Sequence, residues 1–203
     1  MTVPDTQDFR NQLRKTVLLN RRRQENKDEL SRRIVGAFLS LPEYAVASTI
    51  MFYVDAGSEV RTRDILADVL REGDKKIVVP WCTRHGELEL FHLVSMGELE
   101  TGMYRIQEPR GDLRHRPEKQ ARIEELDLIM VPGLGFDHRG ARMGHGKGYY
   151  DKLLVHARED ATFVALAFEC QMLDEIPVAD HDIFMDKIIT EERIYGTARK
   201  QVR

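Results

Sequence analysis

The segment 140–154, "GARMGHGKGYYDKLL", combines residue types that suit a negatively charged ligand. Gly144, Gly146 and Gly148 alternate with other residues, and Lys147 stands between the last two. Glycine permits backbone conformations in which successive N–H groups converge on one anion. A lysine ammonium beside these groups adds a compact positive charge. The spacing therefore favours a cradle for a polyphosphate.

Two further charged residues flank these glycines. Arg142 can bind a phosphate through two parallel hydrogen bonds. Asp151 falls in the first turn of a helix that we predict to begin near Gly148, and the amino end of that helix would attract the same anion. Two interpretations of Asp151 stay open. Its carboxylate interacts with the helix dipole, or it binds Mg²⁺, which typically takes one or two carboxylates together with substrate phosphates.

The whole connection, residues 132–148, is long for a compact domain. Loops longer than about 12–15 residues without regular structure are usually functional or disordered. This one keeps apolar residues that disordered linkers lack, namely Leu134, Phe136 and Met143. We therefore predict an ordered loop that binds a ligand. It follows neither G-x-G-x-x-G nor the P-loop pattern G-x-x-x-x-G-K-[ST], because Gly148 directly follows Lys147.

Length and composition describe one ordinary globular domain. The chain has 203 residues, of which 42% are hydrophobic and 32% charged, enough for a substantial core. No apolar run is long enough to span a membrane, and the first residues do not resemble a secretory signal. Cys82 and Cys170 stand far apart, outside any C-x-x-C pair. We expect two reduced thiols in a cytoplasmic monomer that does not bind membranes.

Charge is distributed unevenly along the chain. The net charge is −3, but residues 1–40 contain nine Lys/Arg and five Asp/Glu, so this segment carries +4 and the remainder −7. A basic segment on an acidic body can contact nucleic acid or lend cations to a small bound anion. Arg10 and Arg14 are spaced i, i+4 and share one helix face. We expect most of the other basic residues there to be solvated, namely most of Lys15, Arg21, Arg22, Arg23, Arg32 and Arg33.

Hydrophobic periodicity predicts alternating helices and strands. We expect helices over 6–40 (with a break, and ended by Pro42), 60–72 and 148–158. We expect strands over 46–54, 75–81, 88–93, 126–131, 162–169 and 187–190. This alternation is typical of a mainly parallel sheet covered by helices on both faces. Ligands bind such sheets beyond the carboxyl ends of the strands, where the loop 132–148 begins.

The segment "VPGLGFDHRGARMGHGKGYYDKLL" resembles the signature of the 5-formyltetrahydrofolate cyclo-ligase family, also called the 5,10-methenyltetrahydrofolate synthetases. Further segments occur in the family's order and spacing: "FRNQLRKTV", "GSEVRT", "KKIVVP", "MYRIQEP" and "IPVADHDIFMDKIITEE". The resemblance covers nearly the whole chain. It implies one domain, residues 1–203, folded as a three-layer α/β/α sandwich around a mainly parallel central sheet.

The resemblance also implies roles for particular positions. For ATP it implies Arg10, Arg14, Arg142, Gly144, His145, Gly146, Lys147, Gly148, Tyr149 and Tyr150. For the folate it implies Val54, Glu59, Tyr104 and Tyr149, and for Mg²⁺ it implies Asp151 and Asp186. Lys147 and Arg142 would act in catalysis, whereas His145 occupies a variable position and has no catalytic role. Consecutive tyrosines cannot share a helix face, so we expect one to pack in the core and the other to line the site.

The implied reaction converts 5-formyltetrahydrofolate and ATP into 5,10-methenyltetrahydrofolate, ADP and phosphate. Ring closure must expel the formyl oxygen, which is a poor leaving group until it is phosphorylated. Phosphoryl transfer asks a protein mainly for alignment and charge neutralisation. Glu59 suits a pterin, whose ring N–H and amino groups offer paired donors to one carboxylate. Without the resemblance, Glu59 could equally be a solvated turn residue.

Two positions depart from the family pattern, and three other functions compete. Arg10 stands where the family often has lysine, and Ala179 replaces a carboxylate, which weakens any role for Asp180 or Asp182.

The basic N-terminal segment could bind nucleic acid, although no recognition motif accompanies it and we expect no nucleic-acid partner. A sugar-phosphate isomerase or CoA transferase could share the architecture, but neither needs this loop. A folate-binding protein without activity is the third alternative; in every folate case the substrate could be polyglutamylated.

Overall fold

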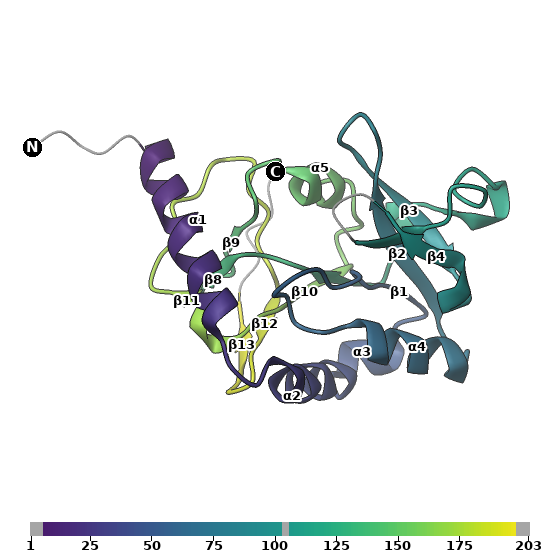
Figure 1. The fold of residues 1–203 in the computed structure, drawn as a ribbon, viewed down its shortest axis with the longest axis horizontal. Coiled ribbons are helices and arrows are strands. Elements are labelled where there is room, and N and C mark those ends of the chain that lie inside the picture. The colour runs from purple at the N-terminus through teal and green to yellow at the C-terminus, as the bar shows by residue number, and fades with distance from the viewer. Residues whose placement is uncertain (1–5, 103–105, 198–203) are drawn as a thin grey trace, which may run out of the picture.

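The computed structural model describes residues 6–102 and 106–197 (Figure 1). The helices are α1 (Thr6–Arg23), α2 (Lys27–Leu39), α3 (Pro42–Val46), α4 (Arg63–Glu72) and α5 (Tyr149–Leu154). The strands are β1 (Thr49–Met51), β2 (Lys76–Cys82), β3 (Leu88–Leu93), β4 (Leu99–Thr101), β5 (Gln107–Pro109), β6 (Gln120–Ala121), β7 (Leu128–Val131), β8 (Gly135–Asp137), β9 (Arg142–Met143), β10 (Thr162–Leu166), β11 (Met172–Leu173), β12 (Lys187–Ile189) and β13 (Ile194–Gly196). Short 3-10 helices cover Met96–Glu98, Pro117–Lys119, Ile123–Glu125 and Glu169–Gln171.

The central sheet has the strand order β13-β12-β10-β7-β1-β2-β3-β6. Its five inner strands, from β12 to β2, pair in parallel. The pairs β2–β3, β3–β6 and β12–β13 at the two edges are antiparallel. The mainly parallel sheet is therefore confirmed. Within the described residues no helix is both long and apolar enough to cross a membrane.

Alternating side chains bury the sheet on both faces. In β7, Leu128 and Met130 join the core beside α2 and α4, whereas Ile129 and Val131 join the core on the side of α5. Successive side chains of a strand point to opposite faces, so a continuous apolar run needs cover on both sides. Figure 1 shows α2, α3 and α4 below the sheet and α5 above it. This arrangement confirms the α/β sandwich.

The first segment forms two helices, as predicted, and the break lies at Asn26. The backbone of Asn26 is left-handed, with φ of 53°, which no helix residue adopts. The prediction for Pro42 was wrong, because α2 already ends at Leu39 and Pro42 begins α3. Proline is accepted in the first helical turn, since its missing N–H would have no intrahelical partner there.

The loop 132–148 is more regular than predicted. It contains β8 and β9, which pair with each other in antiparallel fashion, and β11 adds to β8 in parallel. This small sheet packs against α1 through a separate apolar cluster that includes Val17, Leu134 and Met143. Helix α1 therefore lies on the hairpin of the loop and not on the central sheet, and this contact brings its arginines to the glycines.

Candidate active site

A large cavity lies at the carboxyl ends of the parallel strands, where the topology places ligands. Its wall is built from α1, the residues that follow β1, β2 and β7, the segment 144–152, and the segment 179–183. Its volume is about 1910 Å³. Pockets for one small molecule measure about 300–1,000 Å³. The cavity therefore has room for two ligands side by side.

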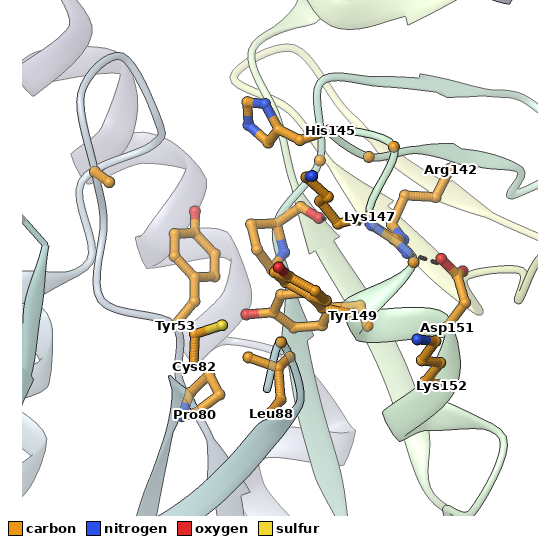
Figure 2. Close-up of a pocket in the computed structure, with 18 of the residues that line it drawn as sticks. Tyr53, Pro80, Cys82, Leu88, Arg142, His145, Lys147, Tyr149, Asp151 and Lys152 are labelled. Atoms are coloured by element: carbon orange, nitrogen blue, oxygen red, sulfur yellow. Dashed lines mark hydrogen bonds and ion pairs between the residues drawn. The ribbon is translucent and has the colours of Figure 1, made fainter. Parts of the chain in front are cut away.

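The two sides of this cavity differ in chemistry. Figure 2 shows Tyr53, Pro80, Cys82 and Leu88 on one side, all from the ends of β1, β2 and β3. The opposite side carries the charged residues of the glycine loop and of α5, with Tyr149 between the two groups. An apolar wall suits a flat ring system, and a charged wall suits an anion.

Arg14 holds the glycine loop against α1. Its Nε donates a hydrogen bond to the carbonyl oxygen of Gly144 at 3.2 Å, and its Nη1 donates to Asn11 Oδ1 at 2.7 Å. Gly146 has a φ of +93°, and a Cβ placed there would lie 3.4 Å from Arg14 Cζ. Any other residue at position 146 would strain the backbone. The loop is thus ordered, and a cation from α1 lies directly on it.

Lys147 extends from the same loop beside the cavity (Figure 2). Its side chain is exposed, and its ammonium has no hydrogen-bond or ion-pair partner among the described residues. A flexible lysine can move toward a bound phosphate at little cost, because no existing interaction has to be broken. Of the predicted phosphate ligands, Lys147 is the one most available for a ligand.

Arg142 is less available than its sequence suggested. Its side chain is 4% exposed, Nη2 donates to Asp151 Oδ1 at 2.9 Å, and Nη1 donates to the carbonyl oxygen of Pro132 at 3.4 Å. The guanidinium lies 5.6 Å from the centre of the Tyr150 ring, and its buried Nε has no hydrogen-bond partner within the described residues. Arg142 thus fixes the start of α5 to the end of β7.

The two predicted metal ligands lie in different places. Asp151 lines the cavity, and its Oδ1 accepts the bond from Arg142 and one from the backbone N–H of Ile183 at 3.4 Å. Asp186 is not among the residues that line the cavity, and its Oδ2 accepts from the backbone N–H of Phe163 at 2.8 Å. The described residues contain no group of three His, Cys, Asp or Glu side chains able to hold a metal alone. A carboxylate plus substrate phosphates is still an ordinary Mg²⁺ environment, and Asp151 fits it.

Arg10 reaches the cavity from α1 but pairs with a carboxylate that we had set aside. Its Nη1 donates to Asp182 Oδ2 at 3.0 Å, and the side chains of the two residues are 14% and 9% exposed. The same oxygen of Asp182 accepts the backbone N–H of Ala179 at 2.8 Å. Asp182 therefore tethers the amino-terminal end of α1 to the segment 179–183, a role that the sequence did not reveal.

The predicted folate residues lie on the opposite wall. Val54 and Glu59 both line the cavity in the segment that follows β1, and Tyr53 is buried beside them. Glu59 Oε2 accepts the backbone N–H of Ala56 at 2.9 Å, so the carboxylate is held within its own turn. Burial raises the pKa of Glu59, and the positive charge of Arg21 opposes that rise. Tyr104 lies outside the described residues.

Sequence reasoning missed Arg21, which it left within a group of basic residues expected to be mostly solvated. Its side chain is 4% exposed and lines the cavity. Its Nη1 donates to the carbonyl oxygen of Gly133 at 3.0 Å, and its Nε donates to Ser58 Oγ at 3.0 Å. The other five residues of that group are exposed, whereas Arg21 lies one helical turn after the buried Val17, on the face of α1 that packs against the body. That spacing was visible and could have identified it.

Both tyrosines of the loop line the cavity, so neither is excluded as a ligand contact. Tyr149 reaches across toward the turn between β2 and β3, where a Cβ on Gly86 would lie 3.2 Å from its hydroxyl oxygen. Tyr150 packs against the core around α5, and burial, with the nearby charge of Glu59, raises its pKa. The exposed His145 also lines the cavity; local desolvation and then the charges of Arg21, Arg14 and Arg142 lower its pKa.

Comparisons with known proteins agree on one family. The family model of the 5-formyltetrahydrofolate cyclo-ligase family matches residues 5–191. A Mus musculus protein named 5-formyltetrahydrofolate cyclo-ligase is 32% identical over 158 residues, covering 74% of this chain and 76% of the relative. A Mycolicibacterium smegmatis protein of the same name is 31% identical over 193 residues, covering 91% and 94%. The solved structure of Aquifex aeolicus 5,10-methenyltetrahydrofolate synthetase is 30% identical, with a TM-score of 0.79 over 93% of this chain and 92% of the other.

Proposed function

The chain belongs to the 5-formyltetrahydrofolate cyclo-ligase family, and we propose that it uses ATP to close 5-formyltetrahydrofolate to 5,10-methenyltetrahydrofolate, releasing ADP and phosphate. One observation carries the proposal. A single cavity is lined by the glycine loop, with the ammonium of Lys147 that is unpaired among the described residues, by apolar residues at the ends of β1 and β2, and by Glu59. The volume is sufficient for a nucleotide and a folate together.

The proposed reaction has two steps. An electron pair of the formyl oxygen on N5 forms a bond to the γ-phosphorus, and the bond from that phosphorus to ADP breaks. N10 then adds to the formyl carbon and loses its proton, and the carbon–oxygen bond breaks as phosphate leaves. The formyl oxygen thus departs within phosphate, which is a far better leaving group than hydroxide. Neither step requires a nucleophile from the protein.

The residues of the cavity would align the two substrates and neutralise the charge of the triphosphate. Lys147 and Arg14, with the backbone N–H groups of the glycine loop, support binding of the triphosphate. Arg142 would position Asp151 and, as a residue of the cavity wall, would add its positive charge beside the phosphates. Glu59 would accept the paired donors of the pterin, whose ring would lie on the apolar wall.

Mg²⁺ would bind to Asp151 together with the phosphates of ATP. When bound, it would neutralise part of the triphosphate charge and polarise the γ-phosphoryl group. The geometry gives no such support to Asp186, whose carboxylate is engaged by a backbone N–H away from the cavity. We further propose a cytoplasmic monomer, for which the two free thiols, Cys82 and Cys170, are the available support.

The test is a rate measurement with purified protein. Absorbance of the methenyl product should grow when 5-formyltetrahydrofolate, ATP and Mg²⁺ are present together, and omission of ATP should abolish that growth. Product formation without ATP, or no formation under any of these conditions, would contradict the proposal.

Asp151→Asn is expected to raise the Mg²⁺ concentration for half-maximal rate by roughly tenfold, because even a change next to a metal ligand typically costs that much affinity. The measurement is a MgCl₂ titration at fixed ATP. The matched control is Asp64→Asn, since Asp64 is also an acidic residue in a first helical turn, in α4, and does not line the cavity. If both variants titrate like the wild type, Asp151 is only a partner of the helix and of Arg142.

Glu59→Gln is expected to raise the KM for 5-formyltetrahydrofolate about tenfold or more, since a hydrogen bond to a charged group contributes about 1.5–3 kcal/mol. The KM for ATP should stay unchanged, because Glu59 belongs to the segment that follows β1 and not to the glycine loop. Initial rates with each substrate varied in turn measure the two constants. A rise in the KM for ATP alone would contradict the assignment of Glu59 to the folate.

A further inference from the structure

Arg21 joins three segments of the cavity wall. It lies in the last turn of α1, and two hydrogen bonds fix its guanidinium, one to Ser58 Oγ and one to the carbonyl oxygen of Gly133, each at 3.0 Å. The fixed position is next to Glu59, with Arg21 Nη1 at 3.7 Å from Glu59 Oε1. That separation is too long for a hydrogen bond but close enough for a strong charge interaction at a buried site.

The two oxygens of Glu59 therefore have different surroundings. Oε2 accepts the backbone N–H of Ala56 at 2.9 Å. Oε1 faces the guanidinium of Arg21, and no hydrogen bond to Oε1 occurs among the described residues. Arg21 can thus balance the charge of the carboxylate without occupying the lone pairs that a ligand N–H would need. A direct hydrogen bond from Arg21 would have competed with that ligand.

Glu59 needs a positively charged partner because its other surroundings favour the protonated form of the carboxyl group. Burial raises the pKa of Glu59, and the nearby Asp55 raises it further. Two phenols also face it, Tyr53 from its own segment and Tyr150 from α5. Arg21 has the largest opposing effect on this pKa, and the smaller opposing charge is Arg61 on the same segment as Glu59. Without Arg21, the protonated form would gain population.

We propose that Arg21 is a positioning residue for the folate, which keeps Glu59 ionised and leaves its Oε1 open to the donors of the pterin. This inference rests on the proposed function and deepens it. It assigns a residue of α1 to folate binding, whereas Arg14 of the same helix contacts the glycine loop that we assign to ATP. It predicts that loss of Arg21 affects folate affinity through Glu59 and hardly affects ATP.

A purely structural role for Arg21 makes a different prediction. The carbonyl oxygen of Gly133 also accepts Gln171 Nε2 at 3.0 Å, so it keeps a partner when Arg21 is replaced. Loss of packing would weaken both ligands and would not change how affinity depends on pH. Two substitutions can therefore separate the effect of the Arg21 charge from the effect of its hydrogen bonds. One removes the charge and keeps a donor, and the other keeps the charge.

The experiment measures the Kd of 5-formyltetrahydrofolate by calorimetry without ATP, from about pH 6 to about pH 9. Arg21→Gln removes the charge but keeps a hydrogen-bond donor, whereas Arg21→Lys keeps the charge. Without the charge of Arg21 the pKa of Glu59 rises further, and a protonated carboxyl accepts less strongly from the donors of the pterin. We therefore expect Arg21→Gln to raise the Kd about tenfold at neutral pH and to recover affinity as pH rises. Arg21→Lys should keep the pH dependence of the wild type.

Two controls make the outcome decisive. Arg23→Met changes an exposed arginine of the same helix outside the cavity and should leave the Kd unchanged. In a Glu59→Gln background, Arg21→Gln should add no further loss, because the two residues act through one another. Equal Kd values and pH profiles for Arg21→Gln and Arg21→Lys would overturn the inference, as would additive losses in the double variant. Failure of the wild type itself to bind the folate would instead contradict the proposed function.

Discussion

Lys147→Ala is expected to lower kcat about a hundredfold to a thousandfold, the loss typical of removing one charged group aimed at developing charge in a transition state. The ammonium of Lys147 has no protein partner in the described part of the chain, so the whole of its charge is available to the triphosphate. The KM for the folate should change little, because Lys147 lies on the opposite wall. Initial-rate kinetics with both substrates varied measure these constants.

The fold should survive this change, because Lys147 is exposed and contributes nothing to the core. Equal melting temperatures for the variant and the wild type would establish that. Lys15→Ala is the matched control, since Lys15 is an exposed lysine on α1 outside the cavity and should keep full activity. A well-folded Lys147→Ala protein with normal kcat would show that the loop does not bind the reacting phosphate.

Arg142→Ala is expected to affect stability as well as rate. The guanidinium is buried, and its removal leaves the carboxylate of Asp151 and the carbonyl oxygen of Pro132 without their shared partner. Breaking a buried ion pair costs about 3 kcal/mol when one partner keeps some contact with solvent. In a domain of this size that corresponds to a fall in melting temperature of roughly 6–12 °C. Thermal unfolding followed by circular dichroism measures the shift.

Activity should fall in the same variant, because Asp151 and the start of α5 lose their fixed position. Arg142→Lys separates charge from geometry, since lysine can pair with Asp151 but cannot reach Pro132 at the same time. We expect an intermediate melting temperature for it. Arg116→Ala changes an exposed arginine outside the cavity and should leave both quantities unchanged. An unaltered melting temperature for Arg142→Ala would mean that the Arg142–Asp151 pair contributes no stability.

The glycine loop could be predicted because its signal is local. Alternating glycines beside Lys147 and Asp151 specify backbone freedom and charge within a few residues. The long apolar runs of β7 and β10 were equally clear, since strands buried on both faces carry no polar interruption. Strand β3 was predicted at its observed bounds, Leu88–Leu93, because a short run of mainly apolar residues follows the polar turn around Gly86.

The short strands of the glycine loop and its neighbour β11 could not be predicted. β8, β9 and β11 have no periodicity of their own and exist because they pair with one another under α1. The expected strand 46–54 shortened to β1, Thr49–Met51, and the expected helix 148–158 shortened to α5. The boundaries depend on where tertiary contacts end, and those contacts come from residues far away in the chain.

Contacts between residues far apart in the chain could not be predicted from the sequence either. Arg10 pairs with Asp182 at a separation of 172 residues, and no local pattern connects them. Arg21 was one of several arginines in a basic segment, and its spacing from the apolar Val17 was the one local signal that distinguished it from the exposed Arg22 and Arg23. The side chain of Asp186 accepts a hydrogen bond from the backbone of Phe163. Its position in the family motif did not predict this contact.

The fate of the formyl oxygen tests the central claim most directly. The purified protein would be given 5-formyltetrahydrofolate labelled with ¹⁸O in the formyl group, together with MgATP, and the phosphate released would be examined by mass spectrometry. Transfer of the oxygen to the γ-phosphoryl group predicts one labelled oxygen in the phosphate for each methenyl product formed. Label found in water, with phosphate unlabelled, would contradict the account.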